Sequence, residues 1–504
     1  MTSSLRNIRL LASIIYQMMR EDPEVFIVKL AERLRQVGIP GLKKSIRSVP
    51  RIEPERIADY GELSVALSMV SADPHRFGWK GKRLADRLTQ QIQVLNIRSP
   101  VSTQHQRPNV GASILYLLTN SFPYTNSGYT QRSHQALLTM KAAGIPVFAV
   151  TRLAYPLDIG KMPQKSIESV DSIRYHRLLP NRYPKTTKER YERSVTMLTN
   201  LAKDKGAAAI HTTTNYLNAI VASRVARNLQ IPWIYEVRGE FEKTWLASLP
   251  LEAQEQAKIS EYYDLIQQQE IQYAIAADAV VVLSEIAKDQ LIDRGVSPDK
   301  ISVIPNAVDP NLLELDFDKE DIRRELGLPT SKTLVGSVSS IVEYEGFDVL
   351  IHALQELPEE CTMVLVGEGT ARPGLEMLVK SEGLEDRVIF TGRKPSETIW
   401  KWYAALDVFV VPRHDIPVCR TVTPIKALTA QALGIPVVAS DLPALREITG
   451  GVASYVCADD PSQLAQGIMC ASDGSEGREW AARRSWISME KAYIQLYRTL
   501  GIGF

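Results

Sequence analysis

The chain has few cysteines, almost no net charge and no long apolar run, and each lack excludes a class of protein. Four cysteines in 504 residues, none in a Cys-x-x-Cys pair, exclude a disulfide scaffold and predict reduced thiols in a cytosolic protein. The net charge of +1 excludes a global field that would attract nucleic acid. No stretch has the apolar length that spans a bilayer, and the N-terminus lacks the apolar block of a secretion signal.

The sequence also lacks pairs of acidic residues at positions where they could bind a metal. No Asp-x-Asp directly follows a predicted strand, which is where a metal-binding carboxylate pair would be placed. Asp316-Phe-Asp318 has the spacing, but it lies in an acidic stretch that is typical of a solvated surface. We therefore expect neither a metal nor another cofactor.

What the chain does contain is typical of a soluble protein with more than one domain. Its composition is 45% hydrophobic and 23% charged, and 504 residues are too many for one ordinary core. We expect a helical, basic N-terminal region, then two α/β domains, then a C-terminal helix that packs back toward the first of these domains. The predicted bounds are 1–108, 109–305, 306–480 and 481–504.

The N-terminal region opens with apolar residues at helical spacing. Two basic residues, Arg6 and Arg9, lie beside this stripe. A basic amphipathic helix can lie on an anionic lipid surface, but most apolar stripes pack against the rest of the protein. Both alternatives stay open here: a cytosolic protein held peripherally on the inner face of a membrane, or a helix packed on the next domain. The stripe consists of Leu5, Ile8, Leu11, Ile15 and Met18.

Short apolar runs alternate with amphipathic stretches from Ala112 onward. Buried strands between helices indicate parallel sheets that are covered on both faces, so the pattern predicts two doubly wound halves. Ligands of such sheets bind beyond the carboxyl ends of the strands. In the first half we expect strands at 112–119, 146–150, 208–211, 232–237 and 279–283, with helices at 131–143, 189–205, 216–228, 254–276 and 284–294. In the second half we expect strands at 333–338, 362–366, 388–391, 408–411 and 436–439, and a last helix at 476–500.

Several motifs in order carry a family resemblance. They are Tyr235-Glu-Val-Arg-Gly-Glu240, Pro305-Asn-Ala-Val-Asp309, Val366-Gly-Glu-Gly369, Val388-Ile-Phe-Thr-Gly-Arg393, Tyr403-Ala-Ala-Leu-Asp-Val-Phe-Val-Val-Pro-Arg413 and Gly434-Ile-Pro-Val-Val-Ala-Ser440. Together they resemble the retaining GT-B glycosyltransferases that use nucleotide sugars, in a branch common in cell-surface polysaccharide synthesis. The resemblance implies two Rossmann-like domains with an interdomain cleft. It also implies a nucleotide-diphosphate sugar donor and a glycan or lipid-linked acceptor.

Basic residues follow a strand in the second half. Arg413 comes just after the strand 408–411, and Lys426 lies in the first turn of a helix expected from Pro424 to Leu433. Basic side chains and helix N-terminal amides both favour anions, so this pair could hold the donor diphosphate and stabilise the leaving group. Arg420 could add a third charge. The alternative is that these residues are ordinary solvated surface charges.

Glycines mark two other strand ends in the second half. Gly367 and Gly369 follow the strand 362–366, where glycine lets backbone amides come close to a ligand. The resemblance implies that Thr391, Gly392 and Arg393 border the nucleotide base. A plain strand-to-helix turn explains such glycines equally well.

In the first half, the resemblance directs attention to a loop and two strand ends. Ser127-Gly128 would face the donor phosphates and the acceptor, and His211, at the expected end of strand 208–211, would contact the sugar or acceptor. Glu236 and Arg238 end the next strand. They could bind the acceptor or a donor hydroxyl, or they could form a structural ion network.

Two departures from the family pattern weaken the catalytic interpretation. Thr429 stands where the second glutamate of the family's pair is expected to bind the donor ribose, and Thr421 stands in place of the first. Glu345 stands where many relatives have a lysine that clamps the diphosphate, and a carboxylate there would oppose binding unless it pointed away. The alternative function is a catalytically degenerate protein that binds nucleotide sugars or regulates.

Overall fold

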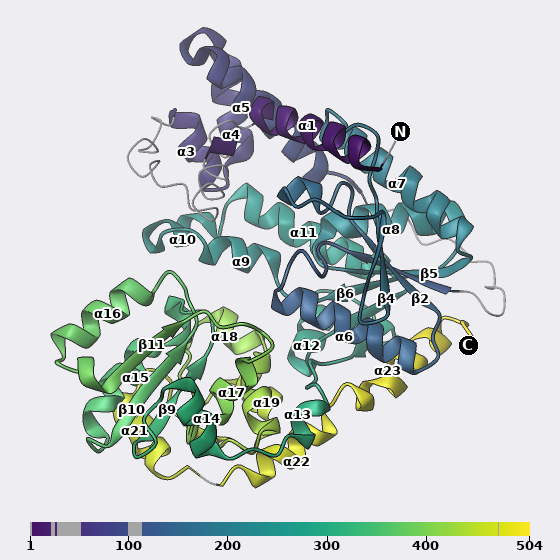
Figure 1. The fold of residues 1–504 in the computed structure, drawn as a ribbon. Helices are drawn as coiled ribbons and strands as arrows, with labels where there is room; N and C mark the ends of the chain where they lie inside the picture. Colours follow the sequence, from purple (N-terminus) through teal and green to yellow (C-terminus); the bar gives the residue numbers. More distant parts are fainter. Residues whose placement is uncertain (1–2, 22–25, 28–51, 99–112, 472) are drawn as a thin grey trace. The chain divides into compact units, whose positions relative to one another are not determined.

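The computed structural model describes residues 3–21, 26–27, 52–98, 113–471 and 473–504, which form two compact units (Figure 1). Unit 1 comprises 1–281, 291–302 and 494–504, and unit 2 comprises 282–290 and 303–493. The last eleven residues therefore belong to unit 1, although the chain passes through unit 2 before it reaches them. The boundary predicted at residue 108 lies outside the described residues.

The N-terminal region is helical. Its elements are α1 (Ser3–Glu21), α3 (Glu53–Asp59), α4 (Leu63–Ala72) and α5 (Pro74–Leu95). The inner face of α1 is buried, and its Leu10 and Ile14 pack on Ala154, Leu157 and Leu179. The predicted apolar stripe is divided by this packing. Leu11 and Met18 pack against the same cluster, whereas the outer Leu5, Ile8 and Ile15 are 53%, 51% and 37% exposed.

Unit 1 is built on an eight-stranded sheet in the order β3-β4-β2-β1-β5-β6-β7-β8. Strands β4, β2, β1, β5 and β6 pair in parallel, and β3 is antiparallel to β4. Its strands are β1 (Ser113–Leu118), β2 (Val147–Thr151), β3 (Ile167–Val170), β4 (Ile173–Arg177), β5 (Ala207–Thr213), β6 (Trp233–Val237), β7 (Ala279–Val282) and β8 (Ile301–Val303).

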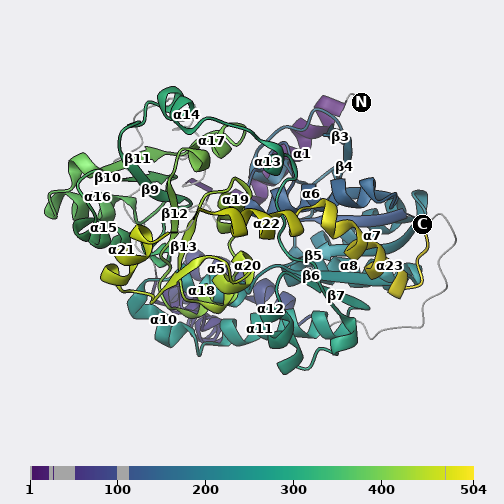
Figure 2. The ribbon, with the colours of Figure 1, turned by 90° about the horizontal axis from the view of Figure 1, so that it is seen from below.

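Helices cover both faces of this sheet, as the apolar pattern predicted. In Figures 1 and 2 α7 and α8 lie on one side of the strands, and α6 and the C-terminal α23 lie on the other. The helices are α6 (Gly128–Ala142), α7 (Thr187–Asp204), α8 (Tyr216–Leu229), α9 (Phe241–Ala247), α10 (Leu251–Ala257), α11 (Glu261–Ala276), α12 (Glu285–Asp293) and α23 (Glu490–Thr499), with short 3₁₀ turns η1 (Leu157–Ile159) and η2 (Pro298–Lys300).

Unit 2 has a six-stranded parallel sheet in the order β11-β10-β9-β12-β13-β14. Alternate strand residues point to two separate cores, one shared with α14, α17, α19, α20 and α22 and the other with α15, α16 and α21. The strands are β9 (Thr333–Val338), β10 (Cys361–Val366), β11 (Val388–Gly392), β12 (Val408–Val411), β13 (Val437–Ser440) and β14 (Ser454–Val456).

The helices of unit 2 complete this doubly wound arrangement. They are α13 (Asn311–Glu314), α14 (Lys319–Leu326), α15 (Phe347–Glu356), α16 (Arg372–Ser381), α17 (Ile399–Ala404), α18 (Pro417–Thr421), α19 (Ile425–Ala432), α20 (Pro443–Thr449), α21 (Pro461–Met469) and α22 (Ser475–Arg483), with 3₁₀ turns η3 (Glu343–Glu345), η4 (Glu385–Arg387) and η5 (Ile487–Met489). In the described part of the chain, no helix is both long and apolar enough to cross a bilayer.

Two stretches that were predicted as single helices are interrupted in the structure, so these two predictions are wrong. The stretch 254–276 is interrupted at Lys258–Ser260, because the Ser260 hydroxyl caps a new helix by accepting a hydrogen bond from the Tyr263 amide. The stretch 476–500 is interrupted after Arg483, where the backbone pairs with Val308 instead of continuing the helix. Long-range pairing outweighs helical propensity at this second break.

Candidate active site

A buried cluster of two cations and one carboxylate lies at the carboxyl ends of β9 and β12 in unit 2. Arg413 follows β12, and its Nη2 lies 3.0 Å from Oε1 of Glu345, which ends the turn η3 after β9. Lys426, in the first turn of α19, also forms an ion pair with Glu345. The three residues are 6%, 8% and 4% exposed in the order Arg413, Lys426 and Glu345. The structure therefore brings together the two cations that the sequence selected.

The charges of this cluster hold one another in place. Burial would raise the pKa of Glu345, but Lys426 and Arg413 lower it to about 2. Burial lowers the pKa of Lys426 to about 8, although Glu345 opposes this shift. Two cations and one carboxylate leave a net charge of +1 at neutral pH. A buried excess charge of this kind favours an anionic partner.

Serine hydroxyls and glycine turns build the surroundings of the cluster. The Lys426 Nζ donates a hydrogen bond of 2.7 Å to Ser339 Oγ. The backbone of Ser339 is held by β10, because its amide donates to the Val366 carbonyl at 2.9 Å. A Cβ on Gly367 would lie 1.8 Å from the Ser339 carbonyl oxygen, and one on Gly369 would lie 1.9 Å from that of Ile341. These glycines let two loops touch, and so they position the serine that meets Lys426.

The other residues selected in unit 2 are exposed or bond to partners outside this cluster. Gly392 ends β11 with a φ of +72°, and its carbonyl accepts from the Gly367 amide at 3.1 Å. Thr391 donates from its hydroxyl to the Gly392 carbonyl at 3.1 Å, and Arg393 is exposed. Arg420 is half exposed and pairs with Asp415 at 2.7 Å instead of joining Arg413. Thr429 donates to the Ile425 carbonyl within its own helix.

His211 is not at a strand end, which corrects the sequence prediction. Strand β5 continues two residues further, through the β-branched Thr212 and Thr213, so His211 lies inside the sheet and is 0% exposed. Its Nδ1 lies 2.8 Å from the hydroxyl of Tyr497 in α23, and its Nε2 lies 3.5 Å from Glu236. Burial lowers the pKa of His211 despite the nearby carboxylate, so the ring is neutral. Its surroundings are those of a core residue.

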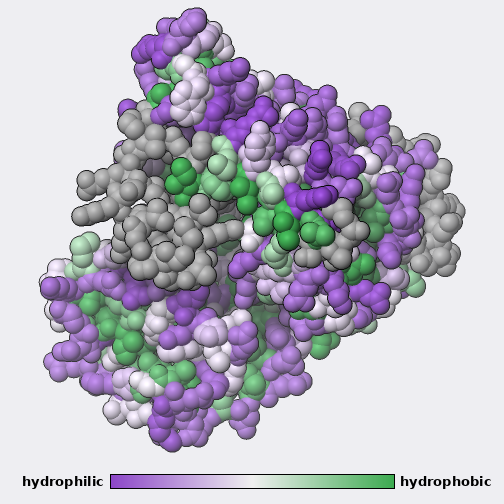
Figure 3. Space-filling model, turned by 45° about the horizontal axis from the view of Figure 1, so that its top comes forward, coloured by the Kyte–Doolittle hydropathy of each residue, from purple (hydrophilic) through white to green (hydrophobic). Residues whose placement is uncertain are grey.

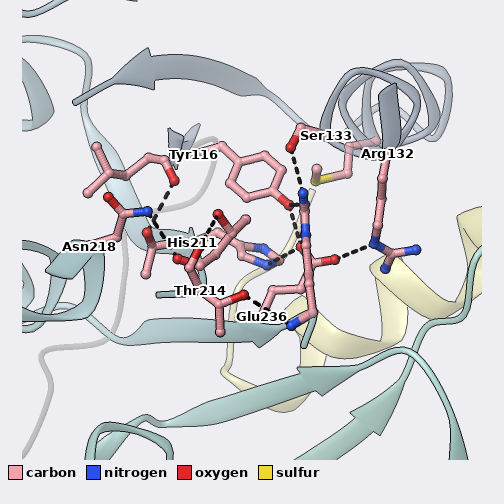
Figure 4. A network of polar contacts seen from close by, with 12 residues as sticks. Tyr116, Arg132, Ser133, His211, Thr214, Asn218 and Glu236 are labelled. Carbon is pink, nitrogen blue, oxygen red and sulfur yellow. Dashed lines mark hydrogen bonds and ion pairs between the residues drawn. The ribbon is translucent and has the colours of Figure 1, made fainter. Parts of the chain in front are cut away.

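Glu236 and Arg238 form a buried ion network, the structural alternative that the sequence left open. Figure 4 shows Glu236 in this network with Arg132 and Tyr116. Glu236 is 0% exposed and accepts from Arg132 Nε at 2.7 Å and Arg238 Nη2 at 3.0 Å. The Tyr116 hydroxyl also donates to it. Although burial opposes ionisation, the two arginines hold the pKa of Glu236 well below its usual range. Nothing in the sequence signalled Arg132 or Tyr116, because they lie 104 and 120 residues away from Glu236.

Ser127 and Gly128 begin α6. The Ser127 hydroxyl caps the helix by accepting from the Thr130 amide, and the Thr130 hydroxyl accepts from the Ser127 amide at 2.8 Å. No atom of a described residue lies within 4 Å of the position that a Cβ on Gly128 would occupy. The chain itself therefore gives no steric reason for a glycine at this helix N-terminus.

Two family models match the chain in the order of its two units. A model described as glycosyl transferase 4-like domain matches residues 127–307, and one described as glycosyl transferases group 1 matches residues 332–473. The chain belongs to the GT-B glycosyltransferases. The family match begins at Ser127 in the loop before α6, so the N-terminal helices α1, α3, α4 and α5 lie outside both family models.

Individual relatives within the family match part of their length. A D-inositol 3-phosphate glycosyltransferase of Xylanimonas cellulosilytica is 31% identical over 248 residues, which are 45% of this chain and 58% of the relative. A lipopolysaccharide core biosynthesis mannosyltransferase of Rhizobium meliloti is 31% identical over 171 residues, which are 32% of this chain and 47% of the relative. The match thus spans about half the length of these curated relatives.

Solved structures share the GT-B fold. A sucrose-phosphate synthase from Thermosynechococcus elongatus superposes with a TM-score of 0.60 at 23% identity. Anabaena HepE in complex with UDP-glucose superposes with a TM-score of 0.57 at 19% identity. Each comparison covers 77% of this chain and 99% of the other. At these identities the likeness shows the fold alone.

Proposed function

We propose that this chain transfers a sugar from a nucleoside-diphosphate donor to a glycan or lipid-linked acceptor in cell-surface polysaccharide synthesis. The observation that carries the proposal is the buried Arg413–Glu345–Lys426 cluster, whose net positive charge lies where ligands of a parallel sheet bind. Donor binding in relatives of the same fold supports it, since HepE has been solved with UDP-glucose.

In the proposed reaction the cluster holds the diphosphate and stabilises the charge that develops as it leaves. The acceptor hydroxyl oxygen attacks the anomeric carbon from the face on which the bond to the diphosphate breaks, and its proton passes to the departing phosphate oxygen. Attack from that face retains the anomeric configuration. Fixed cations aimed at a developing charge are a large catalytic contribution in a site with little water.

The amide groups at the N-terminus of α6, around Ser127 and Gly128, are the proposed contact of unit 1 with phosphate or acceptor. Glu236, Arg238 and His211 have a different role in this scheme. Their side chains are at most 7% exposed and bond to partners inside unit 1, so they hold β5 and β6 in place and do not touch the sugar. The protein's own cations replace a metal in this scheme.

Two observations favour the alternative of a nucleotide-sugar-binding protein without turnover. Glu345 already neutralises one of the two buried cations, and Thr429 has no carboxylate to offer a donor ribose. Calorimetry with UDP-, GDP- and ADP-sugars, followed by assays for donor hydrolysis and transfer, separates the two functions. Binding with slow hydrolysis and transfer supports the enzyme, and NMR of the product tests retention. Binding without turnover supports the alternative, and no binding of any nucleotide overturns both.

We also propose that the protein acts in the cytoplasm and contacts an anionic membrane through the outer face of α1. Leu5, Ile8 and Met19 are each about half exposed on this face, beside the exposed Arg9. Figure 3 shows apolar side chains exposed among hydrophilic ones on the face that it draws. An apolar ridge flanked by cations is the surface that lies on anionic lipid.

Point substitutions test the membrane contact better than a deletion, because the inner face of α1 is part of a core. Leu5→Glu combined with Ile8→Glu should reduce cosedimentation with phosphatidylglycerol vesicles by about tenfold, while UDP affinity stays unchanged. Met377→Glu, which makes the same change at an apolar side chain 70% exposed in unit 2, is the matched control. Equal vesicle binding by the double variant and the wild type would reject the contact.

A further inference from the structure

A cavity of about 280 Å³ in unit 1 lies between α5, α7 and α8, apart from the residues assigned above. Its volume is just below the range of roughly 300–1,000 Å³ that is typical of small-molecule sites. The side chains around it come from three segments of the chain: Gln90, Gln93, Val94 and Ile97 from α5 and the residues after it, Lys188 and Tyr191 from α7, and Arg224 from α8.

The lining of this α5–α7–α8 cavity is cationic. Lys188 and Arg224 face it from two different helices, and none of the seven lining residues is acidic. Arg224 is half-buried, and it forms no hydrogen bond or ion pair with any residue that the structure describes. The ion pair of Lys188 with Glu192 is long, at 3.9 Å, and its side chain is 81% exposed. Both cations are therefore available to an anion.

The walls of the cavity are held in place without a ligand. The Gln90 Oε1 accepts from the Thr187 amide at 2.9 Å, which ties α5 to the start of α7. Beyond α5, the Ile97 carbonyl accepts from Gln272 Nε2 at 3.1 Å and from Gln269 Nε2 at 3.3 Å, and both glutamines belong to α11. A cavity whose walls are fixed in advance loses little conformational entropy when it binds a small ligand.

We propose that the α5–α7–α8 cavity binds a small phosphomonoester. Two cations from separate helices suit a doubly charged oxyanion better than a carboxylate, and a guanidinium can bind phosphate through two parallel hydrogen bonds. Val94 and Ile97 offer apolar surface to a short organic body. The wall that α5 provides lies outside the matched family models, whereas the two cations come from helices inside the model that matches residues 127–307.

Glycerol 3-phosphate is a suitable probe, because it represents both soluble sugar phosphates and the headgroup of phosphatidic acid. Calorimetry on the full chain should detect its binding, and Arg224→Gln should weaken that binding by about tenfold or more. Arg227→Gln makes the same change at an exposed position of the same helix that does not line the cavity, and it should bind like the wild type. Because Arg224 forms no hydrogen bond or ion pair with a described residue, thermal unfolding of Arg224→Gln should match that of the wild type.

Four outcomes would overturn the proposal: no binding of the probe at millimolar concentration, equal weakening in both variants, unchanged binding in Arg224→Gln, or displacement of the probe by UDP. The last would place the anion at the proposed donor site instead. A second arm uses vesicles with phosphatidic acid. An effect of Arg224→Gln on vesicle binding supports a lipid headgroup as the source of the phosphate, and an effect on glycerol 3-phosphate alone supports a soluble ligand. A failure of donor binding leaves this result unaffected.

Discussion

Replacing the buried carboxylate of unit 2 by an amide, Glu345→Gln, should destabilise the protein and strengthen donor binding. The carboxylate lies between Arg413 and Lys426, which lower its pKa from the usual 4.5 to about 2. At 4% exposure solvent screens this interaction little. The lowered pKa corresponds to about 3 kcal/mol in favour of the charged form. Glutamine resembles the neutral form, so the variant should lose about 3 kcal/mol of unfolding free energy at pH 7, or roughly 6–12 °C in Tm for a unit of this size.

The stabilisation that Glu345 provides should depend on pH in a definite direction. Because the folded-state pKa of Glu345 is depressed, its contribution to stability is present above pH 4.5 and is lost as the pH falls toward 2. The difference between wild type and Glu345→Gln, measured by chemical denaturation, should therefore be constant near neutrality and shrink in acid. The exposed neighbour Glu343→Gln is the matched control and should change stability by less than about 0.5 kcal/mol.

The same variant tests whether the cluster meets the donor. Removing the carboxylate takes away the one negative charge of the cluster, which should increase UDP affinity by about tenfold at the effective dielectric of a partly buried site. The comparison belongs at pH 6, because the loss of Glu345 lowers the pKa of Lys426 further. A destabilised variant with unchanged or weaker UDP affinity would refute the donor role and leave the cluster a structural ion triad. A variant as stable as the wild type would refute the electrostatic argument itself.

Three further predictions follow from the two units. Arg413→Ala and Lys426→Ala should each weaken UDP binding by about tenfold or more in calorimetry, whereas Arg420→Ala, which is already paired with Asp415, should not. Because the pKa of Lys426 is about 8, UDP affinity should fall as the pH rises through 8. Lys426→Arg should abolish that fall, since arginine keeps its charge, and the same pH profile in both proteins would contradict the prediction. His211→Asn should lower the unfolding free energy by about 1–3 kcal/mol through the loss of the Tyr497 contact, and UDP affinity should stay unchanged. If the variant lost donor binding without being destabilised, His211 would be a donor-binding residue after all.

The sequence predicted the apolar strands best, because burial on both faces leaves a continuous apolar run. Strands β9 and β12 begin and end at the predicted residues. The β3–β4 hairpin was missed because β3 is a four-residue edge strand with two exposed side chains. Such a strand has no continuous apolar run for the sequence pattern to reveal. His211 was misplaced for a related reason, since Thr212 and Thr213 are polar by composition but favour extended backbone.

The sequence predicted which kinds of residue lie at the site but not which side chains they contact. Position after a strand was enough to select Arg413 and Lys426. Glu345 was expected to oppose an anion, and its actual bonds are to those two cations, which are 68 and 81 residues away in sequence. Such pairing depends on how strands are ordered in the sheet, which local pattern does not specify.

The contact between His211 and Tyr497 has a consequence for the order in which the protein can be completed. Residues 494–504 belong to unit 1, but the ribosome makes them only after 303–493, which belong to unit 2. Until they emerge, the side of the first sheet that α6 and α23 share is covered only in part, and His211 and Met140 lack their contacts with Tyr497. Unit 2 can therefore reach its final form first, and the domain that begins the protein is the last to be closed. During that interval a chaperone, or a second nascent chain, has access to apolar surface that the finished protein never exposes.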